Sequence, residues 1–235
     1  YFADNMLKRI KDGLEGRICT VSGSGNVAQY CAQKLVELGA KVISLSDREG
    51  YIHVPEGLSQ EQINYIIDLK TRQRRSLKYF SEEYACEFVP DSKPWGLPCD
   101  LAFPCATQNE IDEHDAALLL KNGCKLVCEG ANMPTTSAAV HLFRDARILF
   151  APSKAANAGG VAISGMEMTQ NAMRYTLTRE ELEDQLHAIM DRIHRQCVYF
   201  GENDDGVDAL RLGGAHDEGR RALPVDRLVG EEAAP

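Results

Sequence analysis

The chain contains no apolar run approaching the about 20 residues that a membrane-spanning helix needs. Residues 1–11 are mixed and charged and show no signal peptide. Aromatic residues make up only 7% of the 235 residues, whereas apolar residues reach 44% and charged residues 26%, as in ordinary globular proteins. We therefore expect a water-soluble protein, not associated with a membrane, that folds as one large domain or two small ones.

A metal-binding or disulfide pattern is also missing. The eight cysteines include no C-x-x-C pair, and no histidines stand at a matching spacing. Cys19, Cys105, Cys124 and Cys128 lie inside apolar, strand-like runs, where a thiol packs as a small hydrophobe. We expect free thiols, no bound metal and a reducing compartment. That compartment is the cytoplasm, with an organelle as the alternative because the sequence does not begin with methionine.

Positive charge is scarce: 26 lysines and arginines face 35 acids, for a net charge of -9. This balance disfavours nucleic-acid binding, which calls for a basic face. Residues 202–235 hold nine acids and four bases (net -5), which leaves -4 for residues 1–201. The same segment has five glycines and no aromatic residue. It predicts a disordered acidic tail over 202–235, following a domain formed by 1–201.

Strand-like and helix-like segments alternate along the first 200 residues. The expected strands are 17–22, 41–46, 50–54, 101–104, 125–128 and 148–151. The expected helices are 26–38, 59–84 with a break, 109 or 112 to 123, 136–146, 159–174 and 178–200. This order predicts an α/β protein with a Rossmann-like, doubly wound, mostly parallel sheet and helices on both faces.

A glycine-rich turn follows the first predicted strand. Residues 23–28 read G-x-G-x-x-A, and a predicted helix begins inside them. Gly23 permits the tight turn, Gly25 lets a pyrophosphate approach the backbone, and Ala28 allows close helix–strand packing. The helix N-terminus then presents free N–H groups to the phosphates. Asp47 follows the second strand, 22 residues after Gly25, at the spacing typical of a dinucleotide site.

The choice between the two nicotinamide dinucleotides stays open at this level. Asp47 in this position favours NAD, because a carboxylate hydrogen-bonds the ribose hydroxyls. Arg48 follows it directly, and such a cation favours the 2′-phosphate of NADP. Further basic residues stand at Lys70, Arg72, Arg74 and Arg75. The alternative reading of this cluster is a solvated helix face.

Three later turns, 105–110, 129–136 and 152–164, are rich in small and amide side chains. Each follows a predicted strand, so all three belong at the sheet edge where ligands bind in this fold. The alternative is helix capping by Asn109, Thr135 and Asn157. No general base stands out: the six histidines are scattered, and His187 and His194 fit packing better than ligand binding.

Taken together, four segments resemble the cofactor domain of hexameric glutamate dehydrogenase, and most closely its NADP-dependent branch. They are SGSGNVAQ (22–29), LAFPCATQNE (101–110), EGANMPTT (129–136) and KAANAGGV (154–161). The resemblance covers about residues 1–200. It implies a dinucleotide-binding domain over 1–201, with the helices of 155–201 leading toward an interdomain hinge.

The resemblance also implies roles for particular residues. The pyrophosphate would be held by Gly23, Ser24, Gly25, Asn26 and Val27. The adenosine ribose would lie by Asp47 and Arg48, and Lys70, from the basic cluster, is a further candidate for binding the cofactor. The nicotinamide side would be lined by Ala106, Thr107, Gln108 and Asn132, and the amino-acid pocket by Asn157, Val161 and Ser164. The family interconverts L-glutamate and 2-oxoglutarate plus ammonia as a homohexamer.

Three departures from the family pattern stand out. The N-terminal substrate domain, which carries the family's catalytic lysine and aspartate, has no counterpart here, so no catalytic residue is assigned and the chain alone is expected to be inactive. Ser153 replaces a usual glycine, and the segment after about Gly201 does not match. The alternatives are another amino-acid dehydrogenase of the same superfamily and a non-catalytic nucleotide-binding module.

Overall fold

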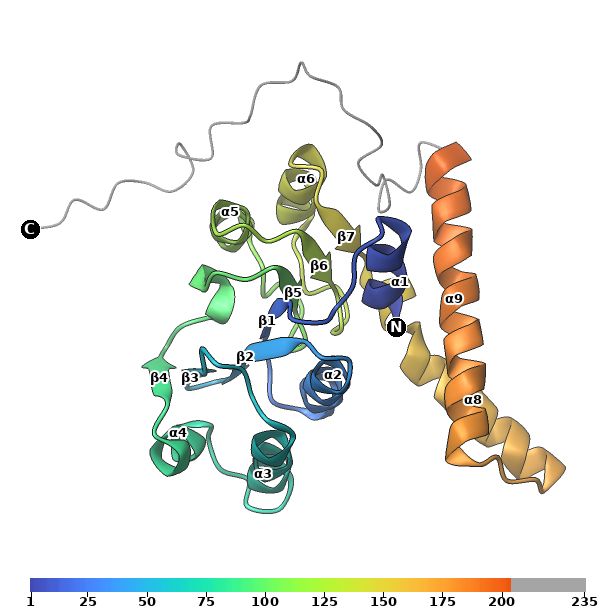
Figure 1. Ribbon diagram of the computed structural model, residues 1–235, viewed down its shortest axis with the longest axis horizontal. Helices are drawn as coiled ribbons and strands as arrows, with labels where there is room; N and C mark the ends of the chain where they lie inside the picture. Colours follow the sequence, from blue (N-terminus) through green and yellow to red (C-terminus); the bar gives the residue numbers. More distant parts are fainter. Residues whose placement is uncertain (204–235) are drawn as a thin grey trace, which may run out of the picture.

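The computed structural model describes residues 1–203, which form one seven-stranded sheet flanked by helices (Figure 1). The strands are β1 (Ile18–Val21), β2 (Lys41–Asp47), β3 (Gly50–His53), β4 (Glu87–Pro90), β5 (Leu101–Phe103), β6 (Leu126–Cys128) and β7 (Leu149–Ala151). Their order is β4-β3-β2-β1-β5-β6-β7. The adjacent strands β2-β1-β5-β6-β7 are parallel to one another, and β3 is antiparallel to both of its neighbours, β2 and β4. The predicted doubly wound α/β fold is confirmed.

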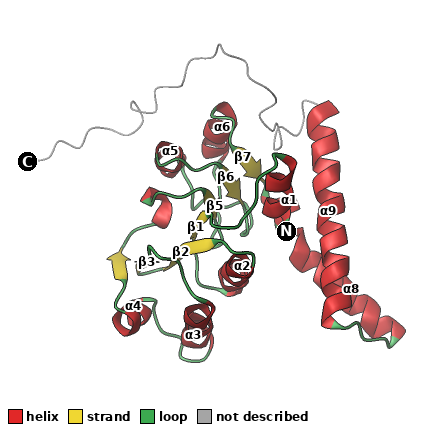
Figure 2. Ribbon diagram, viewed as in Figure 1, coloured by secondary structure: helices red, strands yellow, loops and turns green. Residues whose placement is uncertain are grey.

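The helices are distributed over both faces of this sheet (Figure 2). They are α1 (Phe2–Arg9), α2 (Asn26–Glu37), α3 (Gln60–Thr71), α4 (Lys78–Tyr84), the 3-10 turn η1 (Pro94–Gly96), α5 (Glu113–Lys121), α6 (Ser137–Asp145), α7 (Ser153–Ala156), α8 (Ala158–Met173) and α9 (Arg179–Asn203).

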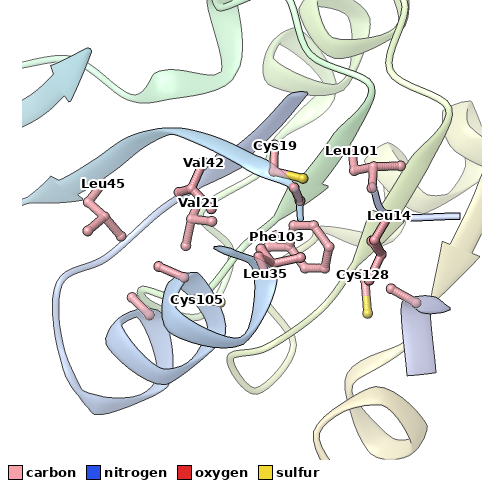
Figure 3. Close-up of a cluster of buried hydrophobic side chains, with 14 of the residues drawn as sticks. Leu14, Cys19, Val21, Leu35, Val42, Leu45, Leu101, Phe103, Cys105 and Cys128 are labelled. Atoms are coloured by element: carbon pink, nitrogen blue, oxygen red, sulfur yellow. The ribbon is translucent and has the colours of Figure 1, made fainter. Parts of the chain in front are cut away.

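Alternate residues of the central strands feed two separate cores, one on each side of the sheet. Cys19, Val21, Leu101 and Phe103 face the core that α1, α2 and α3 complete (Figure 3). Ala102, Val127 and Phe150 face the other core, which η1, α5 and α6 cover. A strand that is buried on both faces has a continuous run of apolar residues, and this pattern allows these short strands to be predicted from the sequence.

The chain reverses its direction of travel across the sheet between β1 and β5. From β1 the sheet grows through β2 to β4 on one side and through β5 to β7 on the other. Loops leaving β1 and β5 diverge at this point and leave a crevice beyond their carboxyl ends, where ligands bind in this fold. The glycine-rich turn and the loop after Phe103 both lie there.

Several predicted boundaries need correction. The strand β4 and helix α1 were not predicted: β4 is a four-residue edge strand and α1 precedes the first strand. Of the two predicted starts for α5, Asn109 is wrong, because Asp112 caps the helix by accepting a hydrogen bond from the amide of Asp115. Thr136, not Thr135, caps α6.

The last two helices extend along one side of the molecule (Figure 1). Helix α9 packs against α1, where His194 meets the ring of Phe2 edge-on at 5.3 Å between centroids and His187 lies 3.7 Å from the ring of Tyr1. The packing role predicted for these two histidines is confirmed. None of the residues of α8 is buried.

The predicted disordered tail lies outside the described residues except for 202–203, which belong to α9. Within residues 1–203, no helix combines the length and apolar character needed to cross a membrane. All eight cysteines are free thiols, and the four singled out in the sequence are buried, as predicted.

Candidate functional site

The glycine-rich turn is braced from beneath by the neighbouring strand. The amide of Gly23 donates to the Ser46 hydroxyl at 2.8 Å, and the amide of Ser46 donates to the Gly23 carbonyl at 3.1 Å. Gly23 has φ of +84°, and a Cβ there would lie 2.9 Å from the carbonyl oxygen of Cys105. Only glycine meets both requirements, so this position is fixed by backbone geometry and by close approach.

The start of α2 opens directly onto the crevice. Gly25 occupies the N-cap position and offers no side chain to the free amides of the first turn. A Cβ at Gly25 would meet nothing within 4 Å, so the space above the turn is open. Ala28 is fully buried against the sheet. A helix N-terminus with an open approach and no capping side chain fits a pyrophosphate.

A cleft of about 850 Å³ lies beyond this turn, between the ends of β1, β2 and β5. Most of the predicted cofactor residues line it: Gly23, Ser24, Gly25, Asn26, Val27, Asp47, Arg48, Lys70, Ala106 and Thr107. They come from segments more than 80 residues apart in the chain. Gln108 and Asn132 are exposed and lie outside its lining.

Asp47 ends β2 with its carboxylate already engaged by the protein. One oxygen accepts from the Lys70 ammonium at 2.9 Å and from the amide of Leu77 at 2.8 Å. The other accepts from the amide of Glu49 at 3.0 Å. Burial by itself raises the pKa of Asp47, but these three donors outweigh it and hold the pKa below its ordinary value. The carboxylate thus organises the rim of the cleft and neutralises Lys70.

This network predicts an acid-sensitive contribution to stability. Because the pKa of Asp47 is lower in the folded chain, its stabilisation is complete above the unfolded value of about 4 and is lost as pH falls through the folded value. Asp47→Asn is therefore expected to lower the melting temperature at pH 7, with a difference from wild type that narrows toward pH 3. Thermal unfolding of the full-length protein across this range measures it.

Asp145→Asn is the matched control, since Asp145 is exposed at the end of α6. A difference between wild type and Asp47→Asn that stays constant from pH 7 to pH 3 would contradict the assignment.

Two arginines at the cleft, Arg48 and Arg74, make neither an ion pair nor a contact with an aromatic ring within the described residues. The other cations around it are engaged. Lys93 pairs with Asp115 at 2.7 Å, and the guanidinium of Arg75 lies 4.8 Å from the centre of the Tyr79 ring. Exposed guanidinium groups at a cleft rim suit a phosphate monoester.

Sequence reasoning missed a buried carboxylate beside the cleft. Glu110 accepts from the amide of Ala106 at 3.0 Å. Its burial raises its pKa above the ordinary value, against the lowering effect of hydrogen bonds from Ser22 and from the amides of Ala106 and Thr107. The four-residue separation of Glu110 from Ala106 is a local signal, but an acid in a turn is usually solvated. Here it fixes the backbone that enters the cleft.

A second group of predicted residues gathers one strand further along the sheet. The side-chain amide of Asn157 donates to the side-chain oxygen of Asn132 at 2.7 Å and approaches the Gly130 carbonyl at 3.4 Å. Asn157 occupies the N-cap position of α8, as the capping interpretation expects, but its side chain makes no capping hydrogen bond there. Val161 and Ser164 lie on α8 with exposed side chains, away from the cleft lining.

Comparison with known proteins decides the family. Residues 1–216 match the family model described as Glutamate/Leucine/Phenylalanine/Valine dehydrogenase. The chain belongs to this family. The resemblance to glutamate dehydrogenase seen in the sequence is thereby confirmed at the family level.

Among curated members of the family, the glutamate dehydrogenase of Bacteroides thetaiotaomicron is 50% identical over 206 residues, which are 88% of this chain and 46% of that protein. The NADP-specific glutamate dehydrogenase of Escherichia coli is 48% identical over 217 residues, covering 91% and 48%. The crystal structure of Plasmodium falciparum glutamate dehydrogenase superimposes with a TM-score of 0.84 at 46% identity, covering 89% and 46%. The chain thus spans about half the length of these relatives.

Proposed function

We propose that this chain forms the cofactor-binding half of an NADP-dependent glutamate dehydrogenase. The enzyme would interconvert L-glutamate with 2-oxoglutarate and ammonia, and the nicotinamide would carry the hydride. The observation that carries the proposal is the cleft at the strand reversal. An uncapped helix N-terminus lies on its floor, and Arg48 and Arg74 at its rim make no ion pair within residues 1–203. Relatives named NADP-specific, at 46–52% identity, support the choice of NADP.

The residues divide the cofactor among them in this proposal. The turn from Gly23 to Val27 binds the pyrophosphate through backbone amides. Arg48 and Arg74 bind the 2′-phosphate, while Lys70 holds Asp47 in place and the Asp47 carboxylate serves as a structural group at the ribose. Ala106, Thr107, Gln108 and Asn132 form the nicotinamide side. Asn157, Val161 and Ser164 form this half's contribution to the amino-acid pocket.

Residues 1–201 act in this proposal as a dinucleotide-binding domain that closes on a substrate domain supplying the catalytic lysine and aspartate. Helices α7 to α9 lead toward the hinge between the two. Because α8 buries none of its own residues, it has a free surface for such a partner. A cytoplasmic homohexamer completes the proposal, and the eight free cysteines fit a reducing compartment.

The family description also covers leucine, phenylalanine and valine dehydrogenases. Eight curated relatives with 45–52% identity are named glutamate dehydrogenases, which favours glutamate as the substrate. Substrate profiling of the full-length protein separates these activities, and a preference for a branched-chain or aromatic amino acid would overturn the proposal.

Calorimetric titration of the full-length protein with NADP and with NAD tests the cofactor. We expect tighter binding of NADP, because only its 2′-phosphate meets the two arginines. A preference for NAD would indicate that Asp47 hydrogen-bonds the ribose hydroxyls and that the two arginines are solvated and do not contact the cofactor. Binding of neither dinucleotide would refute the proposed site.

A further inference from the structure

The start of α7 makes a contact that the cofactor site does not explain. Ser153 is 5% exposed, and its hydroxyl oxygen accepts a hydrogen bond from the amide of Met133 at 3.2 Å. Its own amide donates to one carboxylate oxygen of Glu129 at 2.7 Å. Ser153 therefore joins the turn after β7 to the loop after β6 through both its backbone and its side chain.

That loop, residues 129–136, is held in a demanding conformation. Met133 has φ of +48°, in the left-handed region that side chains other than glycine, asparagine and aspartate seldom adopt. Its carbonyl accepts from the amide of Asn109 at 3.0 Å, and its amide is the donor to Ser153. The second oxygen of Glu129 accepts from the amide of Thr135 at 3.3 Å. A strained residue of this kind persists only where its surroundings fix it.

The loop after β6 and the turn after β7 each contribute one side-chain amide, and the two amides contact each other. Asn132 directly precedes Met133, and Asn157 lies four residues beyond Ser153. Their side chains meet at 2.7 Å. The Ser153–Met133 bond thus joins the same two segments that carry the amide pair, and it limits how far those segments can move apart.

We propose that the Ser153 hydroxyl is a positioning group that fixes the Asn132–Asn157 amide pair for ligand binding. The proposal rests on the proposed function in assigning this pair to the nicotinamide and amino-acid side of the site. The serine touches neither ligand itself. A glycine or alanine at 153 keeps the backbone bond to Glu129 but offers no acceptor to Met133, so the strained loop loses one of the bonds that hold it.

The experiment compares Ser153→Ala and Ser153→Gly with wild type in the full-length protein. Amide hydrogen exchange of the peptide spanning 130–136 is expected to quicken about five-fold in both variants, the effect of losing one neutral hydrogen bond. The Michaelis constants for glutamate and NADP are expected to rise by about the same factor, with kcat within about two-fold of wild type. Ser153→Thr, which keeps the hydroxyl, is expected to restore both.

Ser137→Ala is the matched control, an exposed serine in the first turn of α6 whose hydroxyl makes no hydrogen bond within residues 1–203. It is expected to change neither readout. Faster exchange with unchanged Michaelis constants would show that Ser153 stabilises the loop without positioning the amide pair, which overturns the proposal. Unchanged exchange rates would show that the Ser153 hydroxyl does not hold the loop at all, which also overturns it. If the wild-type protein does not turn over glutamate, the proposed function fails by itself, and the exchange rates still decide whether Ser153 holds the loop.

Discussion

Gly23→Ala is expected to abolish high-affinity NADP binding and to lower the melting temperature of the full-length protein. The substitution places a side chain at φ of +84° and a Cβ 2.9 Å from the Cys105 carbonyl oxygen. The left-handed conformation alone costs about 1–2 kcal/mol, and the contact with backbone adds to it because a carbonyl cannot rotate away. A total above about 2 kcal/mol weakens binding at least about 30-fold if it falls on the bound geometry of the turn.

Gly25→Ala separates the two effects of Gly23→Ala. A Cβ at Gly25 has open space and an ordinary backbone conformation (φ of -81°), so the folded protein should tolerate it. The methyl group would nevertheless project where the pyrophosphate approaches, and we expect weaker binding at an unchanged melting temperature. Gly13→Ala, where a Cβ also meets nothing within 4 Å, should change neither. Wild-type NADP affinity in Gly23→Ala would contradict the assignment of this turn.

The double variant Arg48→Ala/Arg74→Ala is expected to lose at least about 100-fold in NADP affinity while NAD affinity stays within about three-fold. A hydrogen bond to a charged group contributes about 1.5–3 kcal/mol, and two of them correspond to two decades or more in Kd. Neither arginine has an ion-pair partner within the described residues, so their removal leaves no buried carboxylate uncompensated. Calorimetry with both dinucleotides measures the change.

Ionic strength supplies a second readout for the two arginines. Contacts between exposed guanidinium groups and a phosphate are screened by salt, so wild-type NADP affinity should fall with added salt more steeply than that of the double variant. Arg72→Ala is the control, because Arg72 is exposed, pairs with Asp68 at 3.4 Å and does not line the cleft. Equal losses for NADP and NAD would show that the arginines act on something other than the 2′-phosphate.

The fold could be predicted largely from local patterns. Short apolar strands such as Leu126–Cys128 show in the sequence and in the structure alike. The edge strand β4 was missed because its residues are only half-buried and alternate weakly. Helix α1 is buried against β6, β7, α7 and α9, all more than 110 residues later in the chain, and no local pattern in the sequence indicates such partners.

Some site residues could likewise be predicted from local patterns, whereas the contacts of others depend on residues distant in the sequence. Gly23 and Gly25 were found because a dinucleotide turn imposes its requirements on consecutive residues. Asp47 was assigned to a ribose, yet Lys70 and Leu77, 23 and 30 residues later, engage its carboxylate. The same limit applies to Ser153, whose partner Met133 lies 20 residues earlier in the chain.

The sequence by itself thus determined the α/β class, the position of the dinucleotide turn and the family, because these depend on periodicity and on short consecutive motifs. Only the tertiary structure decided which of the basic side chains around the cleft remain free to bind a phosphate. Lys70, Arg75 and Lys93 are engaged by neighbours, while Arg48 and Arg74 face the cleft without an ion pair in residues 1–203. The physical reason is that the availability of a charge depends on distances of a few ångströms between segments that the fold alone brings together.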